Sequence, residues 1–215
     1  GTASGIRTRR YHALLLTATT PPTGRIVLVN GFDAWIETPQ GKFALNSQNY
    51  APGVIHPDGA GRVERFTNEP WPRWHFRFED GTELSQEIFV AQEAQTTALT
   101  WRLLNPRDRV KLFVRPFLSG RDYHSLHKEN SAFRFDAIPN GEKVMWRPYE
   151  GVPGIYAMYS HNGRYNHDPL WYRNFLYEEE RARGLDHTED LASPGCFEWD
   201  LCSGEANWLL TTADS

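Results

Sequence analysis

Apolar and polar residues alternate over many short runs of this chain, which is the pattern of half-buried β-strands. Residues 74–78 read Trp-His-Phe-Arg-Phe, and the Asp80-Gly81 pair that follows is a strong hairpin signal. Comparable runs cover residues 25–36, 84–90, 99–103, 110–114, 133–135, 144–146, 155–159, 198–201 and 208–212. Strands that recur about every 10 to 15 residues, with turn residues between them, favour an all-β fold, a large antiparallel sandwich. Because no repeat or linker divides the chain, we expect residues 1–215 to form a single β-sandwich domain.

One segment departs from this pattern. Residues 171–184 read Trp-Tyr-Arg-Asn-Phe-Leu-Tyr-Glu-Glu-Glu-Arg-Ala-Arg-Gly. The second half is rich in helix formers, Glu179 and Arg183 have i, i+4 spacing, and Gly184 stands where a helix would stop. We therefore expect a short helical excursion near residues 171–184, beside the sandwich.

Composition limits the kinds of partner. The net charge is −4, and no apolar run approaches the roughly 20 residues of a membrane span. Without an overall positive field, neither nucleic acid nor a membrane is an expected partner. The 8 Trp, 9 Tyr and 12 Phe are the strongest compositional signal, because aromatic faces fill β cores and also stack on sugar rings. We expect most of them in the core and a minority available to a ligand.

The two cysteines, Cys196 and Cys202, are poorly placed for a disulfide. If one strand joins them, they lie about 20 Å apart, whereas a disulfide needs Cα atoms within roughly 7 Å. We expect two free, buried thiols in a cytoplasmic protein. No metal or organic cofactor is expected, since His161 and His167 lack the fixed spacing of a metal site.

Two short clusters combine a guanidinium, a phenol and an imidazole. The first is Arg9, Arg10, Tyr11 and His12, ahead of a strand-like run, and the second is Arg121, Asp122, Tyr123 and His124, after one. These groups suit the binding of sugar hydroxyls or the locking of a polar interface. Solvated loops with charged residues are the equally open alternative.

The third cluster is the acidic segment 171–195. Glycoside hydrolysis needs two carboxyl groups roughly 5 to 10 Å apart, and Glu180 with Glu189 or Asp190 is a candidate pair. However, acids interleaved with arginines are usually ion-paired, which holds carboxyl pKa values down, whereas a general acid needs a raised value. Catalysis, binding or docking, and a purely structural role all remain open on the residues alone.

In this order, the three clusters resemble the landmarks of the bacterial and archaeal glycogen debranching enzymes, the amylo-α-1,6-glucosidase family. Residues 1–15, Gly-Thr-Ala-Ser-Gly-Ile-Arg-Thr-Arg-Arg-Tyr-His-Ala-Leu-Leu, resemble the family's opening motif, with Ala13 in place of its usual glycine. Arg121-Asp-Tyr-His124 is similar to the next landmark. The third is carried by Tyr172-x-Asn174-Phe-x-Tyr177, Glu180-x-x-Arg183-Gly-Leu-Asp186 and Glu189-Asp190.

The resemblance implies a β-supersandwich that packs against an (α/α)6 catalytic barrel, and a parent enzyme that hydrolyses α-1,6-glucosidic branch points in glycogen. It implies no catalytic residue here, because the acid and base would lie in the barrel. The resemblance also implies that the chain is a fragment of a larger enzyme, whose catalytic barrel would follow residue 215. The implied partners are α-glucan and the protein's own C-terminal catalytic domain. The residues expected at this substrate or interface surface are Arg9, Arg10, Tyr11, His12, Arg121, Asp122, Tyr123, His124, Tyr172, Asn174, Tyr177, Glu180, Arg183, Asp186, Glu189 and Asp190.

Two other functions remain alternatives. The chain could be a free-standing α-glucan-binding module, which predicts measurable oligosaccharide affinity. It could also be a self-contained glycosidase that uses carboxylates in residues 180–190, which predicts hydrolysis of a branched dextrin. A structural domain that binds no glucan is the remaining possibility.

Overall fold

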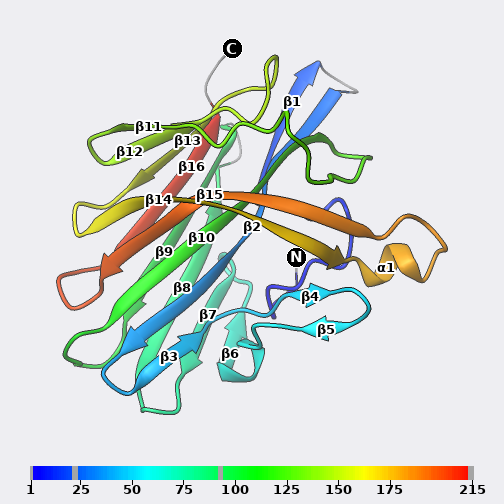
Figure 1. The fold of residues 1–215 in the computed structure, drawn as a ribbon. Helices are drawn as coiled ribbons and strands as arrows, with labels where there is room; N and C mark the ends of the chain where they lie inside the picture. Colours follow the sequence, from blue (N-terminus) through cyan, green and yellow to red (C-terminus); the bar gives the residue numbers. More distant parts are fainter. Residues whose placement is uncertain (1, 21–23, 92–93, 213–215) are drawn as a thin grey trace.

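The computed structural model describes residues 2–20, 24–91 and 94–212. Two antiparallel sheets pack face to face, which confirms the predicted all-β sandwich (Figure 1). The first sheet has the order β1-β2-β10-β15-β14-β4-β5, with β3 paired to β2, and the second has the order β11-β12-β13-β16-β9-β8-β7-β6. That the whole chain is a single domain stays a prediction.

The strands of the first sheet are β1 (Leu15–Thr20), β2 (Gly24–Thr38), β3 (Gly41–Ala44), β4 (Asn49–Tyr50), β5 (Val54–Ile55), β10 (Lys111–Asp122), β14 (Gly163–Leu176) and β15 (Thr188–Asp200). Those of the second are β6 (Val63–Thr67), β7 (Arg73–Arg77), β8 (Glu83–Val90), β9 (Thr96–Leu103), β11 (Ala137–Asn140), β12 (Lys143–Trp146), β13 (Ile155–Tyr159) and β16 (Ala206–Thr212). A 3-10 turn, Ala60–Arg62, precedes β6.

Aromatic side chains fill the space between the sheets. Phe32 from the first sheet meets Trp101 and Trp208 from the second edge to face, at centroid distances of 5.8 and 6.1 Å. Four tryptophans, including Trp146 and Trp199, are almost completely buried. Buried and half-buried residues alternate along β9, as its period-2 pattern predicts. Much of the aromatic content therefore serves the core.

The predicted hairpin at Asp80-Gly81 is confirmed between β7 and β8. Gly81 has φ +78°, a left-handed conformation that glycine adopts at little cost. Asp80 Oδ1 accepts a hydrogen bond from the Thr82 amide at 2.9 Å, which fixes the turn.

The helical excursion is present but shorter than its predicted range. Helix α1 covers only Glu178–Arg181, and Gly184 ends the excursion with φ +69°. Residues 171–176 are instead the last part of β14, where Trp171 pairs with Ala192 on β15. The helix formers lie in the second half of the segment, where α1 is found, while the first half completes the sheet. The expected Glu179–Arg183 pair does not form among the described residues, since Glu179 contacts Arg9 instead.

Both cysteines are free, as expected, but only one is buried. Cys196 lies within β15, whereas Cys202 lies exposed in the turn after it, which corrects the expectation of two buried thiols. The turn places the Cys202 sulfur near the Val110 amide, at 3.3 Å. In the described part of the chain, no group of three or more metal-ligating side chains is clustered. None of its helices is long and apolar enough to cross a membrane.

Candidate functional site

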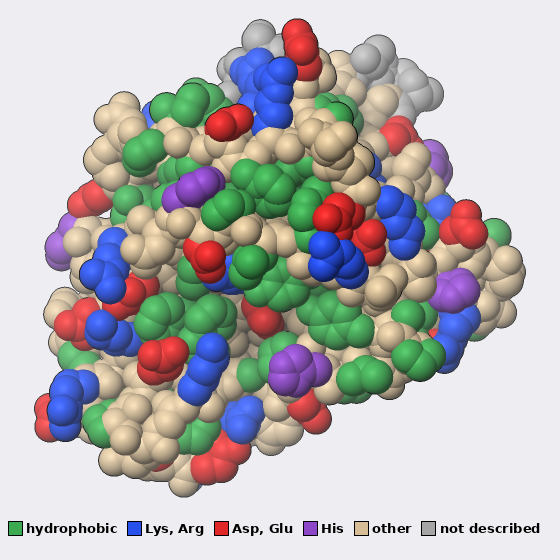
Figure 2. Space-filling model, in the orientation of Figure 1, with side chains coloured by type: hydrophobic (Ala, Val, Ile, Leu, Met, Phe, Trp, Pro, Cys, Tyr) green, Lys and Arg blue, Asp and Glu red, His purple; other side chains and the backbone are tan. Residues whose placement is uncertain are grey.

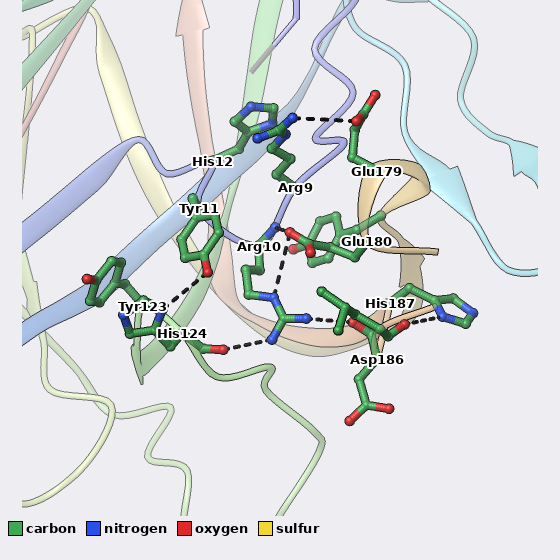
Figure 3. Close-up of polar contacts among 12 residues, drawn as sticks. Arg9, Arg10, Tyr11, His12, Tyr123, His124, Glu179, Glu180, Asp186 and His187 are labelled. Carbon is green, nitrogen blue, oxygen red and sulfur yellow. Dashed lines mark hydrogen bonds and ion pairs between the residues drawn. The ribbon is translucent and has the colours of Figure 1, made fainter. Parts of the chain in front are cut away.

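Arg10 joins all three polar clusters at one end of the first sheet (Figure 3). Its Nη1 donates to the His124 carbonyl oxygen at 2.8 Å, and its Nη2 donates to the Asp186 carbonyl oxygen at 2.9 Å. The Arg10 amide donates to Glu180 Oε1 at 3.2 Å, and Arg10 Nε lies 3.6 Å from the same oxygen. One arginine of the first cluster therefore holds the second and the third.

The outer part of this network is exposed. The Tyr11 hydroxyl lies 3.1 Å from His124 Nδ1, and the Tyr11 ring lies 5.7 Å from the ring of Tyr123. Arg9 and Glu179 form an ion pair at 3.5 Å, with both side chains open to solvent. Such exposed contacts contribute little stability, so these groups remain available to a partner.

A buried ion pair lies beneath this surface. Glu189 is fully buried and pairs with Arg121, whose side chain is 4% exposed. Glu189 also accepts hydrogen bonds from the Tyr177 hydroxyl, from Asn30 Nδ2 at 3.3 Å and from the His127 amide at 2.9 Å. A carboxylate taken out of water needs such compensation, and here four groups on separate parts of the chain supply it.

Arg121 fixes the backbone of the same region. Its Nη2 donates to the Arg10 carbonyl oxygen at 2.7 Å, while its Nη1 donates to the carbonyl oxygens of Asp122 and Tyr123 at 3.1 and 3.3 Å. The Asp122 carboxylate accepts a hydrogen bond from the His124 amide at 2.8 Å. The first two clusters are thus locked to each other through backbone groups.

Asp190 orders the neighbouring loop and the end of β14. Its Oδ1 accepts from the Asn174 amide at 2.8 Å, and its Oδ2 accepts from the Glu129 amide at 3.2 Å. Asn174 has φ +64°, a left-handed conformation that asparagine tolerates better than most residues. Glu129 in turn pairs with Arg173. Asp190 therefore acts on backbone amides, as a positioning group.

Next to Asp190 lies an open hollow of about 820 Å³ with an aromatic wall and a charged rim. Trp171 and Phe135 meet edge to face in it, with a centroid distance of 5.7 Å. Arg173 and Glu129 stand at its rim. Sequence reasoning omitted all four from the candidate residues. Trp171 and Arg173 lie within the third cluster, whereas Glu129 and Phe135 lie on the loop between β10 and β11. The alternating run 133–135 predicted a strand on this loop, which is wrong, because residues 131–136 form no strand.

The pKa shifts of the described residues do not give these clusters a general acid. Burial, together with the charges of Arg7 and Arg9, lowers the pKa of His12 to about 4, so this imidazole is neutral near pH 7. Burial and the Glu189 charge raise the pKa of Tyr177. The pKa of His127 is lowered, chiefly by burial.

Among the described carboxyl groups, only Asp33 has a raised pKa. Burial raises the pKa of Asp33 to about 6. Burial is the main cause that raises the pKa of Tyr50 and of Tyr172, and the charge of Asp33 adds to both shifts. The sequence gives no motif for Asp33, because it lies within an ordinary strand, β2.

The structure brings most of the predicted residues together, but not all. Tyr172 lies apart, in a small aromatic cluster with Phe117 and Phe175 at centroid distances of 4.9 and 6.5 Å. Arg183 is exposed, and no ion pair of the described residues includes it. Asp186 contributes its carbonyl oxygen, while its side chain points away from Arg10 (Figure 3).

The carboxylates of residues 180–190 are poorly arranged for glycosidase chemistry. A general acid or base must come within hydrogen-bond reach of the substrate. Glu180 and Glu189 are 1% and 0% exposed, and their oxygens already face arginine and amide donors. Substrate cannot reach either carboxylate in this structure, and Glu180 belongs to both of the candidate pairs.

Comparison with known proteins identifies the family. The profile described as "Glycogen debranching enzyme N terminal" matches residues 1–207. No curated protein sequence gives a significant match. Among solved structures, a bacterial glucoamylase in complex with acarbose aligns at 12% identity and a TM-score of 0.40, over 97% of this chain and 32% of that one. The chain thus spans about a third of that structure's length. On the strength of the family match, the chain belongs to the glycogen debranching enzyme N-terminal family.

Proposed function

We propose that this chain is the non-catalytic amino-terminal domain of a glycogen debranching enzyme. In this role it docks an (α/α)6 catalytic domain of the same enzyme and contributes to the binding of α-glucan. Branch-point hydrolysis then takes place in the catalytic domain, whose carboxylates supply the acid and base. A cytoplasmic location belongs to the proposal and agrees with the two free thiols.

One observation carries the docking role: three segments far apart in the sequence converge on the Arg10 and Arg121 network. Arg10 contacts His124 across 114 positions and Asp186 across 176 positions. The buried Arg121–Glu189 pair makes this surface rigid, while Tyr11 above it remains 44% exposed. A rigid base with exposed aromatic and charged tips suits a persistent interface with another domain.

The hollow beside Asp190 supports the glucan-binding role. Its wall presents Trp171 and Phe135, onto which the apolar face of a sugar ring can stack. Arg173 and Glu129 on the rim offer charged groups that hydrogen-bond hydroxyls. Hydrophobic side chains also lie exposed between charged groups in the middle of the face that β14 and β15 cross (Figure 2).

Titration calorimetry of the purified chain with a branched dextrin tests this role. Arg173→Ala removes a rim group whose side chain is 59% exposed, so the fold should be unaffected. The matched control is Arg102→Ala, because Arg102 is 55% exposed and also forms a surface ion pair, but on the second sheet. We expect weaker dextrin binding for Arg173→Ala alone. Equal binding by both variants would exclude the hollow as the glucan site.

A free-standing α-glucan-binding module is the second candidate, and the same hollow favours it. The two functions differ in what they require of the Arg10 surface. A free-standing module binds dextrin through the hollow and does not need Tyr11. A docked domain loses enzyme activity when Tyr11 is replaced by alanine, although dextrin binding by residues 1–215 is unchanged.

A further inference from the structure

A second cavity, of about 390 Å³, lies between the amino-terminal segment and the two sheets. It is separate from the hollow beside Asp190 and borders the first cluster only at His12. Trp74, Phe76 and Phe66 of the second sheet form an aromatic wall, and Arg7 and Asn30 contribute polar groups. Its volume is within the range of small-molecule sites.

Arg7 is a buried cation without a polar partner in the described part of the chain. It is 5% exposed, its Nε has no hydrogen-bond partner, and no ion pair includes it. Its guanidinium carbon lies 4.7 Å from the centre of the Phe175 ring and 5.5 Å from that of Phe117. Ring faces attract the cation but accept no conventional hydrogen bonds, so among the described residues the buried Nε is left without an acceptor.

Arg7 is the one charged side chain among the described residues that line the cavity, since His12 is neutral near pH 7. None of the residues that line it is acidic. Asp33 is near enough for Arg7 to influence its pKa, yet the two form no ion pair, and burial still raises the pKa of Asp33 to about 6. His12 Nδ1 accepts from the Thr8 amide at 3.1 Å, so the neutral ring carries its proton on Nε2. Asn30 Oδ1 is buried without a partner.

We propose that this cavity binds a monosaccharide that bears an oxyanion, either a phosphate or a carboxylate. The oxyanion pairs with the planar fork of Arg7, which matches both groups. The sugar ring packs on the aromatic wall, and a ring hydroxyl donates to Asn30 Oδ1. Because the cavity lies apart from the hollow, this second site does not depend on the proposed glucan-binding role.

Calorimetry with glucose 1-phosphate, glucuronate, inorganic phosphate and glucose tests the proposal. We expect at least one of the two anionic sugars to bind, with inorganic phosphate weaker and glucose undetected. Binding of glucose 1-phosphate alone identifies a phosphate site, and binding of glucuronate alone identifies a carboxylate site. Binding of glucose as tight as that of both anionic sugars, or no binding of either anionic sugar, would overturn the proposal.

Two variants locate the site. Arg7→Met keeps an unbranched stem against Phe175 but removes the charge, and should weaken anionic-sugar binding roughly tenfold or more. Arg134→Met is the surface control, because Arg134 is 50% exposed and, among the described residues, its one ion pair is with exposed Glu150. Unchanged affinity of folded Arg7→Met would refute the assignment.

Phe66→Ala decides the question if Arg7→Met does not fold. Phe66 is 41% exposed, so its removal should be tolerated. It should weaken binding of the anionic sugar several-fold while leaving inorganic phosphate unaffected, because only the sugar ring needs the wall. An equal effect on both ligands, or no effect on either, would contradict the proposed binding mode.

Discussion

Replacing Glu189 by glutamine removes the charge at the centre of the polar network. In the wild-type protein, Glu189 is 0% exposed and compensates Arg121, whose side chain is 4% exposed. Breaking one partner of a buried pair typically costs about 3–5 kcal/mol, because the other charge is left buried without compensation. Glutamine is nearly isosteric with glutamate, so the loss of stability reports the missing charge and hydrogen bonds and not the cost of a cavity.

The expected change in thermal stability is large. For a chain of this size, each kcal/mol shifts Tm by about 2–4 °C, so Glu189→Gln should lower Tm by about 6–20 °C. Circular dichroism at fixed pH and ionic strength measures this shift. Glu205→Gln is the matched control, because Glu205 pairs with Arg102 at 2.8 Å but is 42% exposed. An exposed pair contributes about 0–1 kcal/mol, which predicts a shift of a few degrees at most.

Hydrogen exchange shows where the network acts. Glu189 accepts from the His127 amide, and Arg121 donates to the Arg10 carbonyl oxygen. In Glu189→Gln we therefore expect faster exchange in residues 8–12 and 122–130, without a comparable change in β9. If Glu189→Gln and Glu205→Gln lost the same small amount of stability, the network would not be what makes this surface rigid.

Three further predictions follow from individual residues. Burial raises the pKa of Asp33 to about 6, so the folded protein binds this proton more tightly than the unfolded chain, and stability falls as pH rises from about 4 to about 6. Asp33→Asn should therefore raise Tm relative to wild type more at about pH 7.5 than at about pH 4, as thermal scans at both values can check. Gly195→Ala should cost about 1–3 kcal/mol in urea unfolding, because its Cβ would collide with a backbone oxygen of β14. Gly61→Ala, where nothing lies within 4 Å, should cost less, and equal losses would show that the contact at β14 is unimportant. Arg183→Ala should leave the free energy of unfolding within about 0.5 kcal/mol of wild type, because Arg183 is exposed. The same substitution should lower kcat/KM of the complete debranching enzyme. Unchanged kinetics would remove Arg183 from the proposed interface.

The fold was largely predictable because the strands bury one face in a shared core. Alternation such as that of residues 74–78 marks the buried side directly, and the Asp80-Gly81 turn marks a strand boundary. The helix was predictable from the helix formers in the second half of residues 171–184, but its start was not, because pairing with β15 decides the conformation of residues 171–176. Cys202 was misjudged because the turn after β15 could not be placed from spacing alone.

The site was predictable in part. Its residues share a recognisable chemistry in each cluster, and the structure brings Arg10, His124 and Asp186 into contact. What sequence cannot give is the burial of each charge, because the groups that compensate Glu189 come from separate parts of the chain. Arg7 lies in the opening motif and Asp33 in none, but the isolation of both from water comes only from tertiary packing.

Hydrogen exchange on residues 1–215, alone and within the complete debranching enzyme, tests the central claim most directly. In our proposal the catalytic domain covers the exposed groups around Arg10. We therefore expect slower exchange within the enzyme for residues 122–130 and 182–187, which lie at this surface, and little change in β11 to β13 on the second sheet. Protection confined to the second sheet, with residues 122–130 and 182–187 exchanging as fast as in the isolated chain, would contradict it.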